Sequence, residues 1–466
     1  MNKFNSIICT AVALTLVGTA AAQDVEKVLP PPGGTPKDFS LPAKDTFGLE
    51  NGLQGTLIAF GNVPKATITV VVRSGNLNEG DQTWIADLSA DFLLEGTTTR
   101  SSEDIARSAA AMGGQVNVAV GEDQTTISAD VLAEFAPDMI ELIADIVRYP
   151  AYPASELERL KRDRLRQLSI AKTQPQQMAV AEFRKALYGD HPYGQVLPDE
   201  AQLAAYTIDD ARNFYTSNFG AQRTQVYVAG VFDANLARKA IESGFGDWEK
   251  GPAVLINLPK PATGKVVVDV VDRPGASQSN ILLGLPTIAP GNDDWIPLQI
   301  TNSLLGGSFS SRITSNIRED KGYTYSPYSS VSARYHDAYW VQSAAVTTDV
   351  TGPALQEILY EIDNLQKEPP TVEELDGIKN YAAGIFVLQN STRGGIINIL
   401  NYLELQELPD AYLTDYVSNV FAVTPEKVSE IATTYLREQD MTLAIVGDRS
   451  KISEQVEPYI RGEVEE

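Results

Sequence analysis

The chain has 466 residues, of which 43% are hydrophobic and 21% are charged, a composition typical of a folded globular protein. This length exceeds what one hydrophobic core serves and predicts about two to four domains. Because 61 acidic residues stand against 37 Lys and Arg, the formal net charge is -24, which argues against nucleic acid and anionic membranes as partners.

The N-terminus predicts export. Lys3 precedes an apolar run over residues 7–17, and three alanines close residues 1–22, which is the pattern of a cleaved secretory signal peptide. The run is too short to span a bilayer and no later stretch is long enough, so we expect a periplasmic or secreted protein without membrane insertion. The single cysteine, Cys9, lies in this signal, so we expect a mature chain without disulfides or thiolate ligands.

Two stretches rich in proline and glycine mark the expected domain boundaries. Residues 23–45 predict an extended N-terminal lead, and residues 251–265 predict a linker. The two halves of the chain are then residues 46–250 and 266–466.

Hydrophobic periodicity predicts both strands and helices within each half. Residues 66–73 and 116–132 have the alternation of strands, whereas residues 156–173 have the period of an amphipathic helix. We therefore expect α+β units, each with a mostly antiparallel sheet packed by helices.

Several features of the first half recur in the second half at a nearly constant offset. Residues 93–96 read Leu-Leu-Glu-Gly and residues 304–307 read Leu-Leu-Gly-Gly, while the apolar runs 226–230 and 443–447 both end in glycine, 217 residues apart. Repetition at a fixed offset predicts two homologous halves.

The stretch from Asn302 to Ser326 is the most informative part of the second half. It predicts a helix that ends in paired glycines, a polar turn, a second helical turn with Arg318, and a strand that starts near Tyr325. An arginine fork and a phenol across a turn suit the binding of a carbonyl or a developing oxyanion. The alternative is that Arg318 caps a helix and Tyr325 packs in a core.

The histidine supply is too small for an ordinary zinc site. The chain has two histidines, His191 in a predicted turn and His336 in a predicted strand, and their spacing does not pair them as metal ligands. No G-x-S-x-G motif points to a serine nucleophile.

The motif over residues 304–325, L-L-G-G-x-x-x-S-R followed by R-E-x-K-G-x-x-Y, resembles the second-half motif of the M16 (pitrilysin or insulinase-like) metallopeptidases. The resemblance covers nearly the whole mature chain and implies the M16/LuxS-like metallohydrolase fold, with two homologous α+β halves arranged around a cavity. In that family an Arg and a Tyr at these positions hold the substrate backbone. The resemblance thus assigns a catalytic and substrate-binding role to Arg318 and Tyr325.

The helix expected over residues 84–97 is similar to the helix that carries the family's H-x-x-E-H zinc motif. Positions that match the family's two histidines, its glutamate base and its third ligand here carry other residues: Asp87, Ala90, Asp91 and Gln167. We therefore expect no zinc and no other functional metal in this chain. Two alternatives remain for the aspartates, namely weak binding of a hard cation such as calcium, or ion pairs with Arg164 or Arg166.

Residues 113–127 resemble the family's strand after the zinc helix, whose exposed edge pairs with an extended peptide. Asn117 matches that pattern, so the resemblance implies a substrate-binding role for it. An ordinary sheet strand is the alternative.

Together these features predict the zinc-less subunit of a periplasmic heterodimeric M16 peptidase. Such a chain is inactive alone and contributes to metalloendopeptidase activity when a zinc-bearing M16 partner supplies the metal, with unfolded peptides as substrates. The alternative is a catalytically inert binding or scaffold protein with the same fold.

Overall fold

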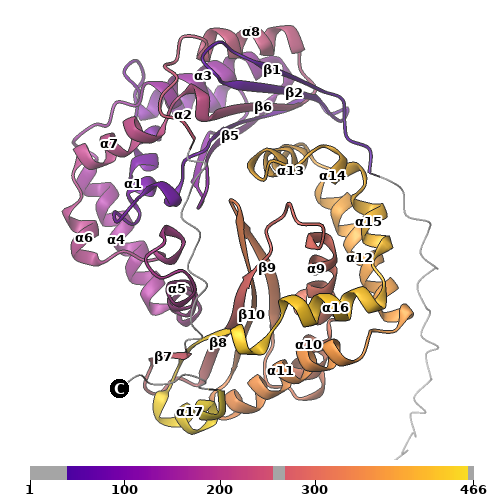
Figure 1. The fold of residues 1–466 in the computed structure, drawn as a ribbon. Helices are drawn as coiled ribbons and strands as arrows, with labels where there is room; N and C mark the ends of the chain where they lie inside the picture. The colour runs from indigo at the N-terminus through magenta and orange to yellow at the C-terminus, as the bar shows by residue number, and fades with distance from the viewer. Residues whose placement is uncertain (1–38, 255–267, 460–466) are drawn as a thin grey trace, which may run out of the picture. The chain divides into compact units, whose positions relative to one another are not determined.

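The computed structural model describes residues 39–254 and 268–459, which belong to one compact unit, Pro36–Glu466 (Figure 1). The predicted signal peptide at residues 1–22 lies outside the described residues. So do most of the predicted lead at 23–45 and most of the predicted linker at 251–265.

The first half contains a sheet with the strand order β1-β2-β6-β3-β5-β4 among the described residues. Its strands are β1 (Lys44–Gly48), β2 (Gln54–Ala59), β3 (Lys65–Val72), β4 (Asn117–Val120), β5 (Thr125–Leu132) and β6 (Thr224–Gly230). β2 and β6 are parallel and the other neighbours are antiparallel.

The second half repeats this arrangement with the order β7-β11-β8-β10-β9. Its strands are β7 (Val268–Asp272), β8 (Gln278–Thr287), β9 (Tyr328–Arg334), β10 (Asp337–Thr347) and β11 (Thr442–Gly447). β7 is parallel to β11, as β2 is to β6 in the first sheet, and the remaining pairs are antiparallel. β1 has no counterpart among the described strands of the second sheet. The shared strand order confirms the prediction of two related α+β halves.

Helices cover these sheets (Figure 1). Those of the first half are α1 (Ile85–Asp91), α2 (Ser102–Ala111), α3 (Ala136–Arg148), α4 (Leu157–Thr173), α5 (Pro175–Tyr188), α6 (Glu200–Ala205), α7 (Ile208–Asn218) and α8 (Ala234–Phe245). Those of the second half are α9 (Trp295–Asn302), α10 (Arg312–Thr314), α11 (Thr351–Lys367), α12 (Val372–Gln389), α13 (Arg393–Leu405), α14 (Ala411–Thr414), α15 (Tyr416–Ala422), α16 (Pro425–Tyr435) and α17 (Arg449–Val456). Within the described ranges, every helix is too short or too polar to cross a lipid bilayer.

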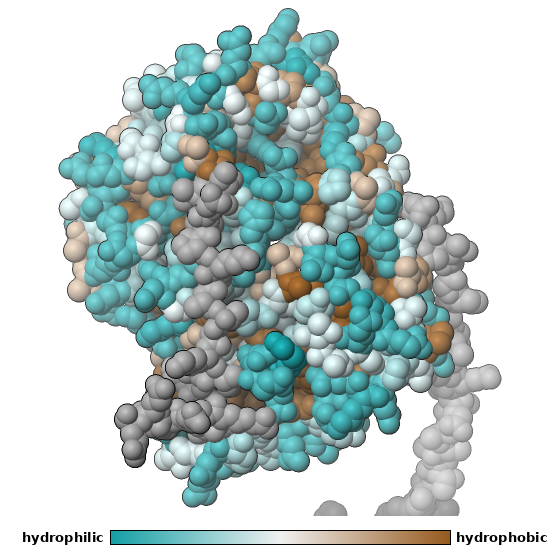
Figure 2. All heavy atoms as spheres, viewed as in Figure 1, coloured by the Kyte–Doolittle hydropathy of each residue, from teal (hydrophilic) through white to brown (hydrophobic). Residues whose placement is uncertain are grey.

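The central strand β3 is buried on both faces along nearly its whole length. Ile68 and Val70 point into the core beneath α3 and α8, whereas Val71 packs with Ile396 and Ile397 of α13 from the second half. Burial on two sides explains why this strand reads as a nearly continuous run of β-branched residues. Outside the cores, the face seen in Figure 2 is mostly hydrophilic, with hydrophobic residues scattered over it.

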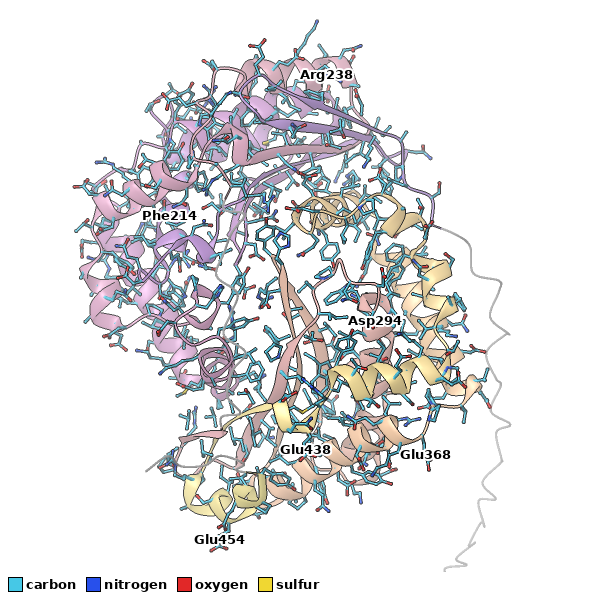
Figure 3. The ribbon with its side chains drawn as sticks, viewed as in Figure 1. Phe214, Arg238, Asp294, Glu368, Glu438 and Glu454 are labelled. Carbon is cyan, nitrogen blue, oxygen red and sulfur yellow. The ribbon has the colours of Figure 1, made fainter. Side chains whose placement is uncertain are left out.

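Helix α9 leads directly into the predicted functional stretch, and an ion pair fixes its start. Asp294 precedes α9 (Figure 3) and pairs with Lys427 Nζ of α16 at 2.8 Å, while Tyr435 Oη donates to the same carboxylate at 2.9 Å. The hydrogen bond from Lys427 holds the pKa of Asp294 below its usual range. The N-terminus of α9 is therefore tied to α16 by charge as well as by packing.

Polar contacts also join the two halves. Glu122, after β4, pairs with Arg184 of α5 at 2.6 Å and with Arg334 of β9 at 3.0 Å. Nearby, Tyr188 Oη donates to Asp337 of β10 at 2.6 Å. Both arginine side chains are about nine-tenths buried, at 9% and 10% exposure, so one carboxylate serves two buried cations from different halves.

We expect Glu122→Ala to destabilise the protein because it leaves both arginines without this counter-ion. Breaking a fully buried pair costs about 3 to 5 kcal/mol. Since the Glu122 side chain is 31% exposed, we expect a loss of about 2 kcal/mol in the free energy of unfolding, measured by urea denaturation.

The matched control is Glu103→Ala, which removes an ion pair with Arg107 on the exposed face of α2. Such a pair contributes about 0 to 1 kcal/mol. Equal losses for the two variants would show that the shared Glu122 contact does not stabilise the junction between the halves.

Candidate functional site

The paired glycines at the end of α9 are required by close packing against the second sheet. Gly306 and Gly307 end a π-helical turn, η6 (Ser303–Gly307), that continues α9. A Cβ atom on Gly306 would lie 2.6 Å from Ser329 Oγ of β9, and one on Gly307 would lie 2.5 Å from Asn302 Nδ2. Asn302 Oδ1 accepts hydrogen bonds from Ser329 Oγ and from Trp340 Nε1, both at 2.8 Å. The turn is thus fixed to β9 and β10.

A second anchor lies beyond the glycines. Arg312 starts α10 and donates through Nε and Nη2 to both carboxylate oxygens of Glu374 on α12, at 2.7 and 2.8 Å. This two-point contact has the geometry that a guanidinium and a carboxylate prefer. The Ser-Arg end of the L-L-G-G motif is therefore structural, and it places the next turn.

Arg318 lies on that next turn, a second π-helix, η7 (Ser315–Asp320). π-Helical turns are rare and often mark functional sites. The guanidinium carbon of Arg318 is 4.3 Å from the centre of the Phe309 ring and 5.0 Å from that of Tyr325. Its Nε lies 3.1 Å from Glu319 Oε1, and its side chain is 22% exposed. The structure thus brings Arg318 and Tyr325 together.

Tyr325 is 80% exposed, so the alternative that it packs in a core is wrong. The strand that was expected to start near Tyr325 starts at Tyr328 instead. Pro327 lacks a backbone N–H and delays regular pairing, although Thr324 forms an isolated bridge with Val346. Tyr325 therefore lies in an irregular connection, outside the alternation of the sheet.

Phe309 is a site residue that the sequence prediction missed. Its ring is 71% exposed in a serine-rich turn, yet it lies closer to the Arg318 guanidinium than Tyr325 does. A large apolar residue in a turn of small polar residues was the available signal.

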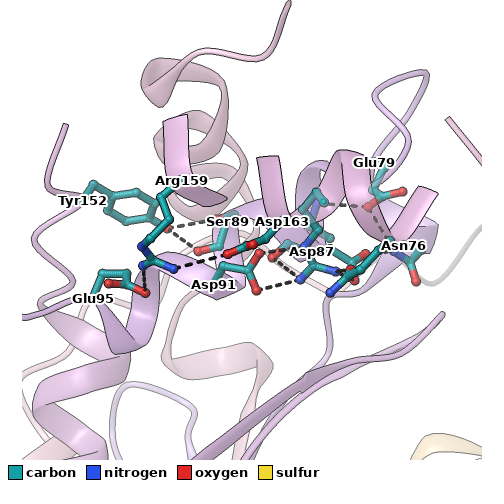
Figure 4. Close-up of polar contacts among 12 residues, drawn as sticks. Asn76, Glu79, Asp87, Ser89, Asp91, Glu95, Tyr152, Arg159 and Asp163 are labelled. Atoms are coloured by element: carbon teal, nitrogen blue, oxygen red, sulfur yellow. Dashed lines mark hydrogen bonds and ion pairs between the residues drawn. The ribbon is translucent and has the colours of Figure 1, made fainter. Parts of the chain in front are cut away.

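The first half brings the four positions that match the zinc site onto two neighbouring helices. Asp87 and Asp91 lie one turn apart on α1, Ala90 is buried beside them, and Gln167 lies on α4. Figure 4 shows the two aspartates side by side.

One guanidinium joins three of these four positions. Arg164 of α4 donates to Asp87 Oδ1 at 3.0 Å, to both oxygens of Asp91 at 2.6 and 2.7 Å, and to Gln167 Oε1 at 3.2 Å. Arg166, the other expected partner, is 72% exposed and pairs with Asp163 instead. Burial raises the pKa of the Asp91 carboxyl, against the hydrogen bond and charge of Arg164, which lower it.

Glu79, a buried carboxyl before α1, lies next to the group formed by Asp87, Asp91 and Arg164 (Figure 4). Glu79 accepts hydrogen bonds from the backbone N–H groups of Trp84 at 3.0 Å and Ala86 at 2.9 Å, and from Asn76 Nδ2 at 3.0 Å. Burial raises the pKa of Glu79 to about 8, although these three bonds favour the ionised form. Asn76 Nδ2 also donates to Asp87 Oδ2 at 2.9 Å. The sequence prediction missed Glu79, which caps the start of α1.

The donor set does not fit zinc. Ala90 offers no ligand or base, a guanidinium charge already lies between the two carboxylates, and Gln167 is a weak neutral donor. Across residues 39–254 and 268–459, His, Cys, Asp and Glu side chains form no cluster of three or more that could hold a metal ion.

Asn117 begins β4, the edge strand of the first sheet. Among the described strands, β4 pairs only with β5, so its other edge is unpaired. Asn117 is exposed and accepts a hydrogen bond from Gln115 Nε2 at 3.0 Å. A hollow of about 360 Å³ is lined by Val118 and Val120 on one side and by Asp91 and Arg164 on the other. An extended peptide can add to such an edge.

Neither histidine belongs to these sites. His191 lies in a turn, as predicted, where its Nδ1 accepts from the Tyr193 backbone N–H at 3.2 Å. His336 was predicted in a strand but lies in the tight turn between β9 and β10 with φ of 55°. A short hairpin needs positive φ, which His adopts more readily than β-branched residues do.

Two family descriptions match this chain. "Insulinase (Peptidase family M16)" matches residues 58–199, and "Peptidase M16 inactive domain" matches residues 205–381. The uncharacterized zinc protease YmxG of Bacillus subtilis is 27% identical over 408 residues, which cover 86% of this chain and 97% of that protein.

Solved structures agree on the fold. A protease from Helicobacter pylori has a TM-score of 0.82 at 19% identity and covers 88% of this chain and 100% of its own. A peptidase M16 inactive domain from Pseudomonas fluorescens has a TM-score of 0.81 at 23% identity. The match covers 87% of this chain and 98% of the Pseudomonas chain.

Proposed function

This chain belongs to the M16 peptidase family, and from that premise we propose that it is the zinc-less subunit of a heterodimeric peptidase. The partner in this proposal is a zinc-bearing M16 chain, and the substrates are unfolded peptides. The signal-like N-terminus supports a periplasmic or secreted location.

The asymmetry between the two halves carries this proposal. In the first half, the positions that match the zinc site are engaged by Arg164. In the second half, Arg318 and Tyr325 lie together and Tyr325 is 80% exposed. A chain with this pattern lacks the metal chemistry of a peptidase but keeps polar groups that a peptide can reach.

We assign Arg318 and Tyr325 to the carbonyl of the peptide bond that is cleaved. When water attacks that carbonyl, negative charge grows on its oxygen, and fixed donors stabilise this charge more in the transition state than in the ground state. The ion pair of Arg318 with Glu319 uses Nε, so the terminal nitrogens are the donors in this assignment. The partner's zinc would supply the activated water.

An inert binding or scaffold protein is the second candidate. The hydrogen bonds of Arg164 with Asp91 are compatible with this candidate, since a scaffold needs no metal. The pairing of Arg318 with Tyr325 counts against a pure scaffold, because a scaffold has no chemical reason to keep this arginine and tyrosine together.

The first prediction from this proposal concerns assembly. The purified mature chain should cleave no peptide alone, and activity should appear on mixing with a zinc-bearing M16 chain from the same organism. Size-exclusion chromatography and a fluorogenic peptide assay measure both points. If the chain stays monomeric and inactive beside every such partner, the heterodimer proposal is wrong and the scaffold candidate is favoured.

The second prediction concerns the Tyr325 hydroxyl. Loss of one oxyanion donor typically costs about 100- to 1000-fold in rate. We expect Tyr325→Phe to lower kcat/KM of the assembled pair by at least about tenfold, a cautious lower bound, with complex formation unchanged.

Tyr360→Phe is the matched control, because Tyr360 is another exposed tyrosine of the second half, on α11. It should leave kcat/KM unchanged. Wild-type kinetics for Tyr325→Phe in an active complex would remove Tyr325 from the mechanism.

A further inference from the structure

The Arg164 side chain uses its whole hydrogen-bonding capacity. A guanidinium has five N–H donors. Nε donates to Asp91 Oδ2 at 2.7 Å, and Nη2 donates to Asp91 Oδ1 at 2.6 Å and to the Asp87 carbonyl at 3.1 Å. Nη1 donates to Asp87 Oδ1 at 3.0 Å and to Gln167 Oε1 at 3.2 Å. Each of the five donors thus has an oxygen acceptor.

These acceptors form a closed set of oxygen ligands. They come from two carboxylates, one backbone carbonyl and one side-chain amide, which are the groups that hard divalent cations prefer. The Arg164 side chain is 15% exposed, and the Asp87 and Asp91 side chains are 21% and 28% exposed. The positive charge therefore lies among oxygens that are mostly shielded from solvent.

The same contacts connect α1 and α4. Asp87 and Asp91 belong to α1, whereas Arg164 and Gln167 belong to α4. A divalent ion bound to these oxygens would link the two helices in the same way. The tethered guanidinium has an advantage over such an ion, because it is always present and needs no binding from solution.

We propose that Arg164 is a built-in cation that takes the place of a metal ion between α1 and α4, and that its removal opens a latent divalent-cation site. The ligands of the latent site are Asp87, Asp91 and Gln167. This inference concerns the chain alone and does not depend on the proposed peptidase partner.

Manganese is the probe, because Mn²⁺ accepts oxygen ligands and is visible by electron paramagnetic resonance. We expect the mature wild-type chain to bind no stoichiometric Mn²⁺ or Zn²⁺ and to keep the same Tm with and without about 1 mM MnCl₂, a concentration that fills weak oxygen-donor sites. Arg164→Ala should have a lower Tm than wild type, and MnCl₂ should raise it. Its affinity for Mn²⁺ should exceed that of wild type at least about tenfold.

Two controls separate this effect from general destabilisation. Arg166→Ala removes an exposed neighbouring arginine and should gain no Mn²⁺ binding. Adding Asp87→Asn and Asp91→Asn to Arg164→Ala should abolish the gain, because the charged ligands are then neutral.

Arg164→Met, which keeps the length of the side chain, is the second variant in case Arg164→Ala folds poorly. If either variant folds only when MnCl₂ is present, that result supports the proposal. The proposal is overturned if both variants bind Mn²⁺ no more tightly than wild type, or if neither folds with or without MnCl₂. It is also overturned if wild type binds one metal ion that is lost in Asp91→Asn.

Discussion

Largely buried arginines, each paired with a carboxylate from a distant segment, connect separate elements of this chain. A charge that leaves water needs an opposite charge and a full set of hydrogen bonds. Arg164 links α4 to α1 under this constraint, and Arg312 links α10 to α12. Arg184 and Arg334 share Glu122 where the two halves meet. Each pair adds a directional contact between elements that the hydrophobic cores also hold together.

The same constraint gives opposite results in the two halves. In the first half, all five N–H donors of Arg164 are hydrogen-bonded to oxygens of the protein itself. In the second half, Arg318 has one ion pair among the described residues and two aromatic rings against its planar face. Stacking on rings orients a guanidinium without consuming its N–H donors. Arg164 is therefore fully engaged inside the protein, whereas Arg318 keeps its terminal nitrogens as donors for the carbonyl in the proposed function.

The sequence was sufficient for the features that depend on periodicity. Alternating residues placed β3, and the helical period placed α4 to within one residue of its start. The recurrence of Gly230 and Gly447 at strand ends matched a real correspondence, because β6 and β11 take the same position in their sheets. Local pattern and repeat spacing therefore gave the fold class.

Contacts between distant side chains were harder to predict. Arg164 and Arg166 were equal candidates as partners of the aspartates, because spacing along α4 does not show which side chain points toward α1. Phe309 and Glu79 were missed because their roles depend on contacts across turns. The π-helical turns at 303–307 and 315–320 were also missed, since their apolar spacing is close to that of an α-helix.

Because every N–H donor of Arg164 is hydrogen-bonded, single substitutions around it have a predictable effect on stability. A histidine at position 87 or 91, as in the family's zinc motif, would remove carboxylate acceptors while the guanidinium remained, leaving buried donors without partners. Removing Arg164 first would instead leave two neighbouring carboxylates without their counter-ion. We therefore expect each of these single substitutions to give a less stable protein. Arg164 therefore opposes a stepwise change of positions 87 and 91 to the histidines of the family's zinc motif.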